Sequence, residues 1–255
     1  MSFNVRLGVA DDGDDSWEHR KELLLETVRA FAPDLLGTQE TYPFQAEYLL
    51  EGLGGYEYVG WPRQPGSQDG EQCGILFRSE RFEQRDAGQF WLSETPEQPG
   101  SRSWDAAFPR VVTWVRLWDR AQERELVFLN THFDHLGARA RAESARMLRE
   151  HALGLEPPGA WIATGDFNTP EGSEPWLALV GDPAVSDTFR AAHPEPEEGE
   201  GTFNGFTGER TGGRIDWILC GPGFETLAAA IDRTQREGRF PSDHFPVTAV
   251  LRWRD

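Results

Sequence analysis

The hydrophobic positions of this chain switch between helical spacings and short apolar runs. Apolar residues recur every three or four positions in three segments, at residues 17–31, 44–53 and 138–155. This spacing predicts three amphipathic helices. Pro33 follows the first segment and Gly54 follows the second, and both residue types commonly end helices.

Short apolar runs predict β-strands around these helices. The runs lie at residues 3–5, 34–39, 56–61, 74–77, 110–118, 126–129, 161–164, 215–219 and 247–251. A continuous apolar run such as 126–129 is typical of a strand that is buried on both faces. Because strands outnumber helices and the two are interleaved, we expect two packed sheets with helices outside, in a single domain spanning residues 1–255.

Length and composition narrow the class of protein. A chain of 255 residues with ten Trp and sixteen Phe can bury a substantial core, which excludes a solvated disordered chain. No segment approaches the roughly 18 unbroken apolar residues that a membrane-spanning helix needs. No charged start followed by an apolar stretch indicates a signal peptide, so we expect a cytoplasmic location. Two Cys residues allow one disulfide at most.

The charge balance is strongly acidic. Lys and Arg number 25 against 43 Asp and Glu, which gives a net charge of −18. An acidic surface repels a phosphate backbone, so bulk binding to duplex nucleic acid is disfavoured. The acidity either serves solubility alone or includes a local cluster that binds cations, and only the individual positions distinguish these alternatives.

Polar side chains gather at the ends of the apolar strands, most of them directly after a strand, with Asp243 and His244 directly before the last one. They include amides, carboxylates and imidazoles, at Asn4, Gln39, Glu40, Asn130, His132, Asp166, Asn168, Asp243 and His244. Each one alone is typical of a turn or a surface position. Asp216 is different, because an acid within the apolar run 215–219 is costly to bury without a partner or a cation. Pockets form at the ends of sheet strands, so the whole set predicts a site.

The residue types favour hydrolysis at phosphorus. Oxygen donors without clustered Cys or closely spaced His suit Mg²⁺ or Mn²⁺ better than Zn²⁺. Phosphoryl transfer needs a metal that neutralises oxygen charge and an aligned water. A carboxylate–imidazole pair supplies a base for that water, and a further imidazole can donate to the phosphate.

Six short blocks resemble the endonuclease/exonuclease/phosphatase superfamily. They are Ser-Phe-Asn-Val-Arg at 2–6, Gly-Thr-Gln-Glu at 37–40, Asn-Thr-His at 130–132, Gly-Asp-Phe-Asn at 165–168, Arg-Ile-Asp at 214–216 and Pro-Ser-Asp-His at 241–244. The stretches 101–110 and 130–135 resemble a subgroup of small bacterial members. The superfamily includes deoxyribonucleases, abasic-site endonucleases, deadenylases, neutral sphingomyelinases and inositol polyphosphate 5-phosphatases.

The resemblance implies a fold and a cation site. The fold is a four-layer α/β sandwich with two central, mainly antiparallel sheets flanked by helices. One divalent cation, Mg²⁺ or Mn²⁺, is expected at Glu40, with Asn4 nearby and Asp243 as a further ligand.

The resemblance also implies the catalytic groups. Asp166 is expected to orient the attacking water, Asn168 to support the phosphate, and His132 to contact it. Asp216 is expected to pair with His244, as base or as orienting couple. An aspartate beside the ring favours the imidazolium, so we expect a raised pKa for His244.

Two further positions carry alternatives. Glu71 matches either a family acid that pairs with His132 or a solvated loop residue. Arg110 matches either a phosphate-contacting residue at the start of a strand or a structural ion pair. Arg6, Arg20, Arg102, Arg110 and Arg214 together offer a local basic lip for a phosphorylated substrate.

Three functions compete. The first is a Mg²⁺- or Mn²⁺-dependent hydrolase of phosphodiesters or phosphomonoesters, acting as a monomer on a small metabolite, a lipid head group or nucleic acid. The second is a weak or inactive module of the same fold that binds phosphate ligands. The third is a metal-stabilised interaction protein. The filled positions at Glu40, Asp166 and His244 favour the first.

Overall fold

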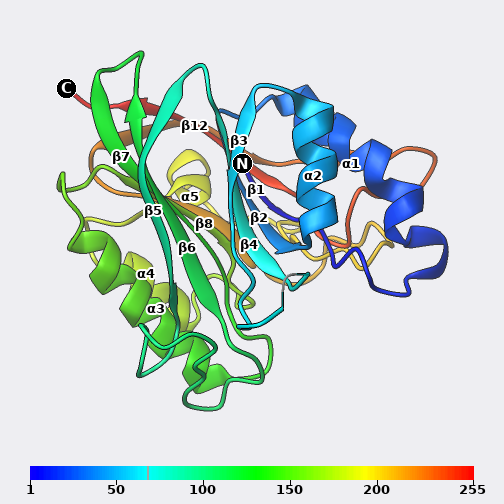
Figure 1. Ribbon diagram of the computed structural model, residues 1–255, viewed down its shortest axis with the longest axis horizontal. Coiled ribbons are helices and arrows are strands. Elements are labelled where there is room, and N and C mark those ends of the chain that lie inside the picture. Colours follow the sequence, from blue (N-terminus) through cyan, green and yellow to red (C-terminus); the bar gives the residue numbers. More distant parts are fainter. Residues whose placement is uncertain (68) are drawn as a thin grey trace.

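The computed structural model describes residues 1–67 and 69–255, and its centre is formed by two six-stranded β-sheets (Figure 1). The first sheet has the order β11 (Phe224–Ile231), β12 (Val247–Trp253), β1 (Ser2–Asn4), β2 (Leu35–Thr41), β4 (Gln72–Arg78), β3 (Tyr56–Val59). The second has the order β5 (Phe82–Trp91), β6 (Val111–Asp119), β7 (Arg124–His132), β8 (Trp161–Asp166), β10 (Asp216–Cys220), β9 (Ser186–Asp187). Only β1 with β2 and β7 with β8 pair in parallel among the described strands, so both sheets are mainly antiparallel as predicted.

Helices cover the two outer faces of this pair of sheets. They are α1 (Trp17–Phe31), α2 (Pro43–Leu53), α3 (Ala138–Leu153), α4 (Glu174–Val180) and α5 (Thr188–Ala192), with a 3₁₀ turn at Gly13–Asp15. Figure 1 shows α1 and α2 on one side of the sheets and α3 and α4 on the other. Three hydrophobic clusters fill the spaces between these layers. The predicted four-layer α/β sandwich is therefore confirmed.

Strand β7 shows how the sequence produces the layers. Leu126 and Phe128 belong to the cluster between the two sheets, whereas Val127 and Leu129 belong to the cluster that includes residues of α3. Successive side chains of a strand point to opposite faces, so an unbroken apolar run fills two cores at once. The burial on both faces that the sequence predicted for this segment is confirmed.

Three strands, β5, β9 and β11, were not predicted from the sequence. All three lie at the outer edge of their sheet, and the exposed residues of β5, at 84–86, are polar. Leu227 of β11 is 50% exposed. An edge strand is hydrogen-bonded on one side only and is less completely buried, so it needs no continuous apolar run. The short helices α4 and α5 were missed because seven and five residues are too few to show a periodic pattern.

Two simpler expectations concern membranes and disulfides. Within the described residues, no helix combines the length and apolar character needed to cross a membrane. Cys73 and Cys220 are both free and buried, so the single disulfide that the composition allowed is absent. Burial raises the pKa of Cys73 to about 12 and that of Cys220 to about 11.

Asn130 of β7 joins the two sheets beneath their polar ends. Its Nδ2 donates to the carbonyl oxygens of Thr38 and Gly74 in the first sheet, both at 2.8 Å. Its Oδ1 accepts from Gln39 Nε2 at 2.7 Å and from Thr164 Oγ1 at 3.0 Å. Asn130 is fully buried, so each of these partners would lose its hydrogen bond in an apolar setting if the amide were removed.

Asn130→Ala is therefore expected to lower the free energy of unfolding by about 3 kcal/mol, because several buried polar groups become unsatisfied. Urea denaturation would measure the change. Gln122→Ala, at an exposed turn, is the control and should stay within about 0.5 kcal/mol of the wild type. A loss below about 1 kcal/mol for Asn130→Ala would contradict the bridging role.

Candidate active site

The polar ends of the two sheets meet at one end of the sandwich. Asn4 at the end of β1 donates from Nδ2 to Asp166 Oδ2 at the end of β8, over 3.0 Å. This bond crosses from the first sheet to the second. A cavity of about 290 Å³ lies between the sheets elsewhere, lined by residues such as Leu126, Ile162 and Trp253. It includes none of the strand-end residues, so the site is the polar cluster and not this cavity.

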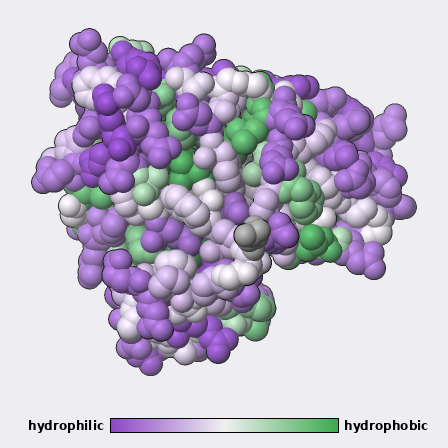
Figure 2. Space-filling view, in the orientation of Figure 1, coloured by the Kyte–Doolittle hydropathy of each residue, from purple (hydrophilic) through white to green (hydrophobic). Residues whose placement is uncertain are grey.

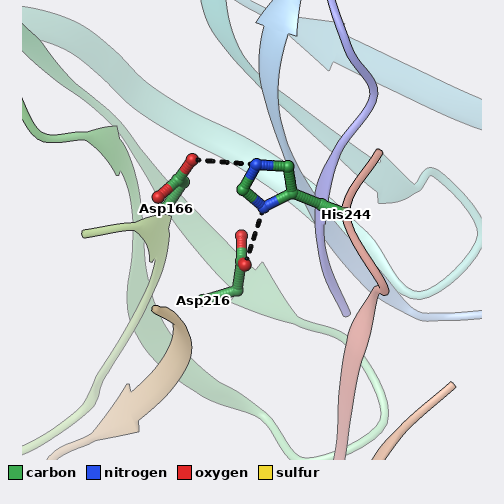
Figure 3. Close-up of side chains that lie close together, drawn as sticks. All are labelled: Asp166, Asp216 and His244. Atoms are coloured by element: carbon green, nitrogen blue, oxygen red, sulfur yellow. Dashed lines mark hydrogen bonds and ion pairs between the residues drawn. The ribbon is translucent and has the colours of Figure 1, made fainter. Parts of the chain in front are cut away.

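His244 lies between two aspartates at this end (Figure 3). Its Nδ1 is 2.9 Å from Asp216 Oδ2, and its Nε2 is 3.7 Å from Asp166 Oδ2. One ligand atom from each of the three side chains lies within 4.8 Å of the others, so the group could also hold a metal ion. Asp216 is the first residue of β10 and lies opposite Asp166. The sequence had suggested a position inside the strand, so that prediction is corrected by one residue.

The charges around His244 and Asp166 shift the pKa values of both side chains. Burial, the largest influence, disfavours a charged ring, but the carboxylates of Asp216 and Asp166 outweigh it and raise the pKa of His244 well above its usual value. This is the direction that the sequence predicted. Burial and the neighbouring Asp216 carboxylate raise the pKa of Asp166. These shifts favour the imidazolium form of His244, with Nδ1 bonded to Asp216 and Nε2 facing Asp166.

His132 is the opposite case. Burial, assisted by the nearby Arg110 guanidinium, lowers the pKa of His132 to about 3, so the ring is neutral at physiological pH. Asn168 Nδ2 donates to His132 Nε2 at 2.9 Å. The ring proton is therefore on Nδ1, which faces Glu71 Oε1 at 3.6 Å. In this arrangement His132 holds the Asn168 amide in place.

Glu40 is aimed by an irregularity in β2. The register between β2 and β4 shifts between Thr38 and Thr41, and Glu40 there has φ of +58°. Bulges next to functional sites commonly redirect a side chain, and strained backbone clusters at such sites. Glu40 Oε1 accepts from Asn4 Nδ2 at 3.1 Å and Oε2 accepts from Leu7 N at 3.0 Å.

Asn4 contacts the carboxylates of the site through its side-chain nitrogen. Its Nδ2 bonds to both Glu40 and Asp166, while its Oδ1 accepts from Arg6 N at 3.0 Å. The amide oxygen is therefore already engaged by the backbone. In this geometry Asn4 orients two carboxylates, and Glu40 and Asp243 are the oxygen donors of the predicted cation set.

Asp243 and Glu40 together fit a divalent cation. Burial raises the pKa of Asp243, and the Glu40 carboxylate adds to this shift. Asp243 Oδ2 has its nearest ion-pair partner, Arg6 Nη1, at 3.5 Å, which is too long for a strong hydrogen bond. Asp243 is buried and Glu40 is partly buried, so their mutual repulsion would be relieved by a cation, and carboxylate oxygens are donors that Mg²⁺ and Mn²⁺ prefer.

Arg110 and Glu71 both lie in the site. Arg110 is 5% exposed, and neither its Nε nor its Nη1 has a hydrogen-bond partner among the described residues. Its Nη2 is 3.2 Å from His135 Nδ1. Glu71 is buried and pairs with Arg63 at 2.7 Å, so it is not a solvated loop acid. Arg63 was missed, because nothing in its polar loop distinguishes it.

The basic lip suggested by the sequence does not form as a surface. Arg20, Arg110 and Arg214 are 3%, 5% and 2% exposed. Arg214 pairs with Asp187 at 2.6 Å, in the interior. Counting Arg residues in a sequence does not reveal which of them are buried as structural ion pairs.

A known family model covers almost the whole chain. The Endonuclease/Exonuclease/phosphatase family model matches residues 1–244. The chain belongs to this family. The resemblance proposed from the six sequence blocks is thereby confirmed.

Solved structures support the assignment over the full length. A mannosyl-6-phosphatase of Bacteroides thetaiotaomicron is 33% identical, with a TM-score of 0.88, and the match covers 99% of this chain and 98% of that one. A family member of Bacteroides vulgatus is 28% identical, with a TM-score of 0.92, covering 99% and 97%. Membership and these relatives identify the chain as a phosphoester hydrolase by class.

A curated relative matches over a shorter stretch. An uncharacterised protein of Acanthamoeba polyphaga mimivirus is 26% identical over 161 residues, or 60% of this chain. The match spans 59% of the length of that relative.

Proposed function

We propose that the chain is a divalent-metal-dependent hydrolase of phosphomonoesters, with phosphorylated sugars as its substrate class. The observation that carries the proposal is one connected set of polar contacts across both sheets. It runs from Glu40 through Asn4 to Asp166, and from there to His244 and Asp216.

The cation would be held by Glu40 and Asp243, with Asn4 fixing the Glu40 carboxylate. When bound, it would neutralise negative charge on the phosphoryl oxygens. Asn168 Nδ2 already donates to His132 Nε2 and to the Phe133 carbonyl, so Asn168 would support the phosphate indirectly, by holding the His132 ring. Arg110 would donate to the same phosphate, because among the described residues its Nε and Nη1 make no hydrogen bond and only long ion pairs, to Asp134 at 3.5 Å and Glu71 at 3.9 Å. Fixed donors of this kind stabilise charge that develops in the transition state.

Asp166 would accept a proton during the reaction, and His244 would donate one. Asp166 Oδ2 faces both His244 and Asn4, so a water beside it would be oriented by its carboxylate and lose a proton to it. Asp216 would keep the His244 ring in place. The imidazolium would then be available to donate, either to the phosphate or to the leaving oxygen.

Two observations favour a sugar phosphate over nucleic acid. The mannosyl-6-phosphatase match is above 30% identity and covers 98% of that protein. The net charge of −18 disfavours contact with a long phosphate backbone. Figure 2 shows hydrophilic residues over much of one face, with smaller apolar patches among them. The buried Arg110 is suited to a single phosphate that enters the site, and we infer no extended basic groove.

A substrate panel tests the proposal. Mannose 6-phosphate, p-nitrophenyl phosphate, bis(p-nitrophenyl) phosphate and a single-stranded oligonucleotide would be assayed with Mn²⁺ and with EDTA. We expect the monoesters to be hydrolysed fastest, and only with metal. Faster cleavage of the diester or the oligonucleotide would show that the substrates are phosphodiesters and that the proposed class is wrong. Binding without turnover of every compound would favour the inactive phosphate-binding module.

Glu40→Gln is expected to weaken Mn²⁺ binding by roughly 10–100-fold while the fold persists, because the amide keeps the shape and loses the charge. Isothermal titration calorimetry would measure the dissociation constant. The matched control is Glu57→Gln, an exposed glutamate of β3, which should bind Mn²⁺ as the wild type does. Unchanged Mn²⁺ affinity in Glu40→Gln would show that the cation lies elsewhere.

His244→Ala separates this site from the second group that could hold a metal. If the cation is held by Glu40 and Asp243, the alanine variant should keep an Mn²⁺ dissociation constant within a few-fold of the wild type. Loss of binding in His244→Ala together with normal binding in Glu40→Gln would instead place the ion among Asp166, Asp216 and His244.

A further inference from the structure

Arg20 of α1 is a buried arginine whose hydrogen bonds go to the main chain. It is 3% exposed. Its Nη1 donates to the carbonyl oxygens of Val5 at 2.6 Å and Pro241 at 3.1 Å. Its Nη2 donates to the carbonyl of Arg6 at 3.0 Å, and its Nε to that of Asp15 at 3.0 Å. The planar fork of one guanidinium therefore ties three segments together.

Two of these segments carry the proposed cation site. Val5 and Arg6 directly follow Asn4, and Pro241 precedes Asp243 by two positions. The two segments come from opposite ends of the chain. Ser242 Oγ donates to the Asn4 carbonyl at 2.7 Å and forms a second, smaller link between them. Arg20 and Ser242 thus link the segment that carries Asn4 to the segment that carries Asp243.

The charge of Arg20 does not by itself favour a cation. Burial lowers the pKa of Arg20 to about 10, and nearby Asp243 and Asp12 oppose that shift. A positive group close to a metal site repels the metal, so the benefit of Arg20 has to come from geometry. The rings of Trp17 and Phe206 lie 5.3 and 5.8 Å from the guanidinium carbon and help fix its plane.

We propose that Arg20 is a positioning residue for the cation site, holding the segments that carry Asn4 and Asp243 at the separation the metal requires. The inference rests on the proposed metal dependence. Arg20 itself touches neither the metal nor the substrate. Mutating a residue that orients a metal ligand commonly lowers the metal affinity by about 10–100-fold.

Arg20→Lys tests the geometry, because lysine keeps the charge and loses the fork. We expect its Mn²⁺ dissociation constant, measured by calorimetry, to rise by roughly tenfold or more. Arg20→Met removes the repelling positive charge as well as the fork, so weaker Mn²⁺ binding than in the wild type would show that the loss comes from geometry and not from charge. Arg149→Lys is the matched control, since Arg149 donates to the carbonyl of Ala178 on α4, and its Mn²⁺ affinity should be unchanged.

Thermal unfolding of the metal-free proteins separates positioning from support of the fold. A folded Arg20→Lys with a lower unfolding temperature but wild-type Mn²⁺ affinity would overturn the proposal. If Arg20→Lys does not fold, Arg20→Gln carries the test, because its amide keeps two donors and loses the fork, and a several-fold loss of affinity is expected. Wild-type affinity in a folded Arg20→Gln would then overturn the proposal.

The Glu40→Gln variant distinguishes a failure of the proposed cation site from a failure of the role proposed for Arg20. If the wild type binds no Mn²⁺, or if Glu40→Gln binds it normally, the proposed cation site fails. If Glu40→Gln weakens binding and folded Arg20→Lys does not, the cation site stands and only the role of Arg20 is wrong.

Discussion

Asp166→Asn is expected to lower turnover by a factor of roughly 10²–10⁴, the range typical of lost acid–base help. Asp166 is 1% exposed, and its Oδ2 lies 3.0 Å from Asn4 Nδ2, 3.4 Å from His132 Nε2 and 3.7 Å from His244 Nε2. An asparagine fills the same space but cannot accept the proton of the attacking water. Steady-state kinetics on the best substrate of the panel, with saturating Mn²⁺, would measure the loss.

A stability measurement keeps this result interpretable. Burial and the Asp216 carboxylate raise the pKa of Asp166, so its charge is unfavourable in the folded protein. Asp166→Asn should therefore unfold at or above the wild-type temperature while turnover falls. Asp182→Asn, at a turn where the carboxylate accepts from Ala184 N, is the control and should keep wild-type turnover. Near wild-type turnover in Asp166→Asn would remove Asp166 from the reaction.

The double variant Asp216→Asn/His244→Ala is expected to be little worse than His244→Ala alone. His244→Ala should lose roughly 10²–10⁴ in turnover, as expected for a general acid or base. Asp216 acts on the reaction through the ring, since its Oδ2 is bonded to His244 Nδ1. Once the ring is gone, the aspartate has nothing left to orient, and residues that act as a unit give non-additive losses.

His193→Ala provides the control. His193 bonds through Nε2 to the carbonyl of Ala229 and is not one of the strand-end residues, so His193→Ala should leave turnover unchanged and should add no further loss to that of Asp216→Asn. If the losses from Asp216→Asn and His244→Ala multiplied in full, the two side chains would act independently. Asp216 would then be a structural acid, and His244 would contact the phosphate without its help.

The sequence determined the layers of this fold because burial imposes local periodicity. The run 126–129 is apolar at every position, and β7 fills a core on each of its faces. The spacing over residues 17–31 predicted α1 with its observed bounds, and Ala32 in the left-handed region followed by Pro33 ends that helix. Periodicity could not reveal β5 and β11, because only a few scattered residues of these edge strands are buried and they form no regular pattern.

The sequence also indicated the family and a set of candidate site residues, through the six blocks at the strand ends. The family model, which matches residues 1–244, confirms the family to which these blocks pointed. The roles of Glu40, Asp166 and His244 stay predictions from residue type and resemblance. The acid–imidazole pairing of Asp216 and His244 was an expectation of the same kind, and the two side chains lie 2.9 Å apart.

Only the tertiary structure decided how these groups face one another. Asn4 bonds to Glu40 and Asp166 because two sheets pack together, and no local pattern encodes contacts over 36 and 162 residues of chain. The bulge that aims Glu40 depends on pairing with β4. Arg20 counts as one more positive charge in the sequence. Its burial makes it a link between the two ends of the chain, because a buried guanidinium must find carbonyl partners.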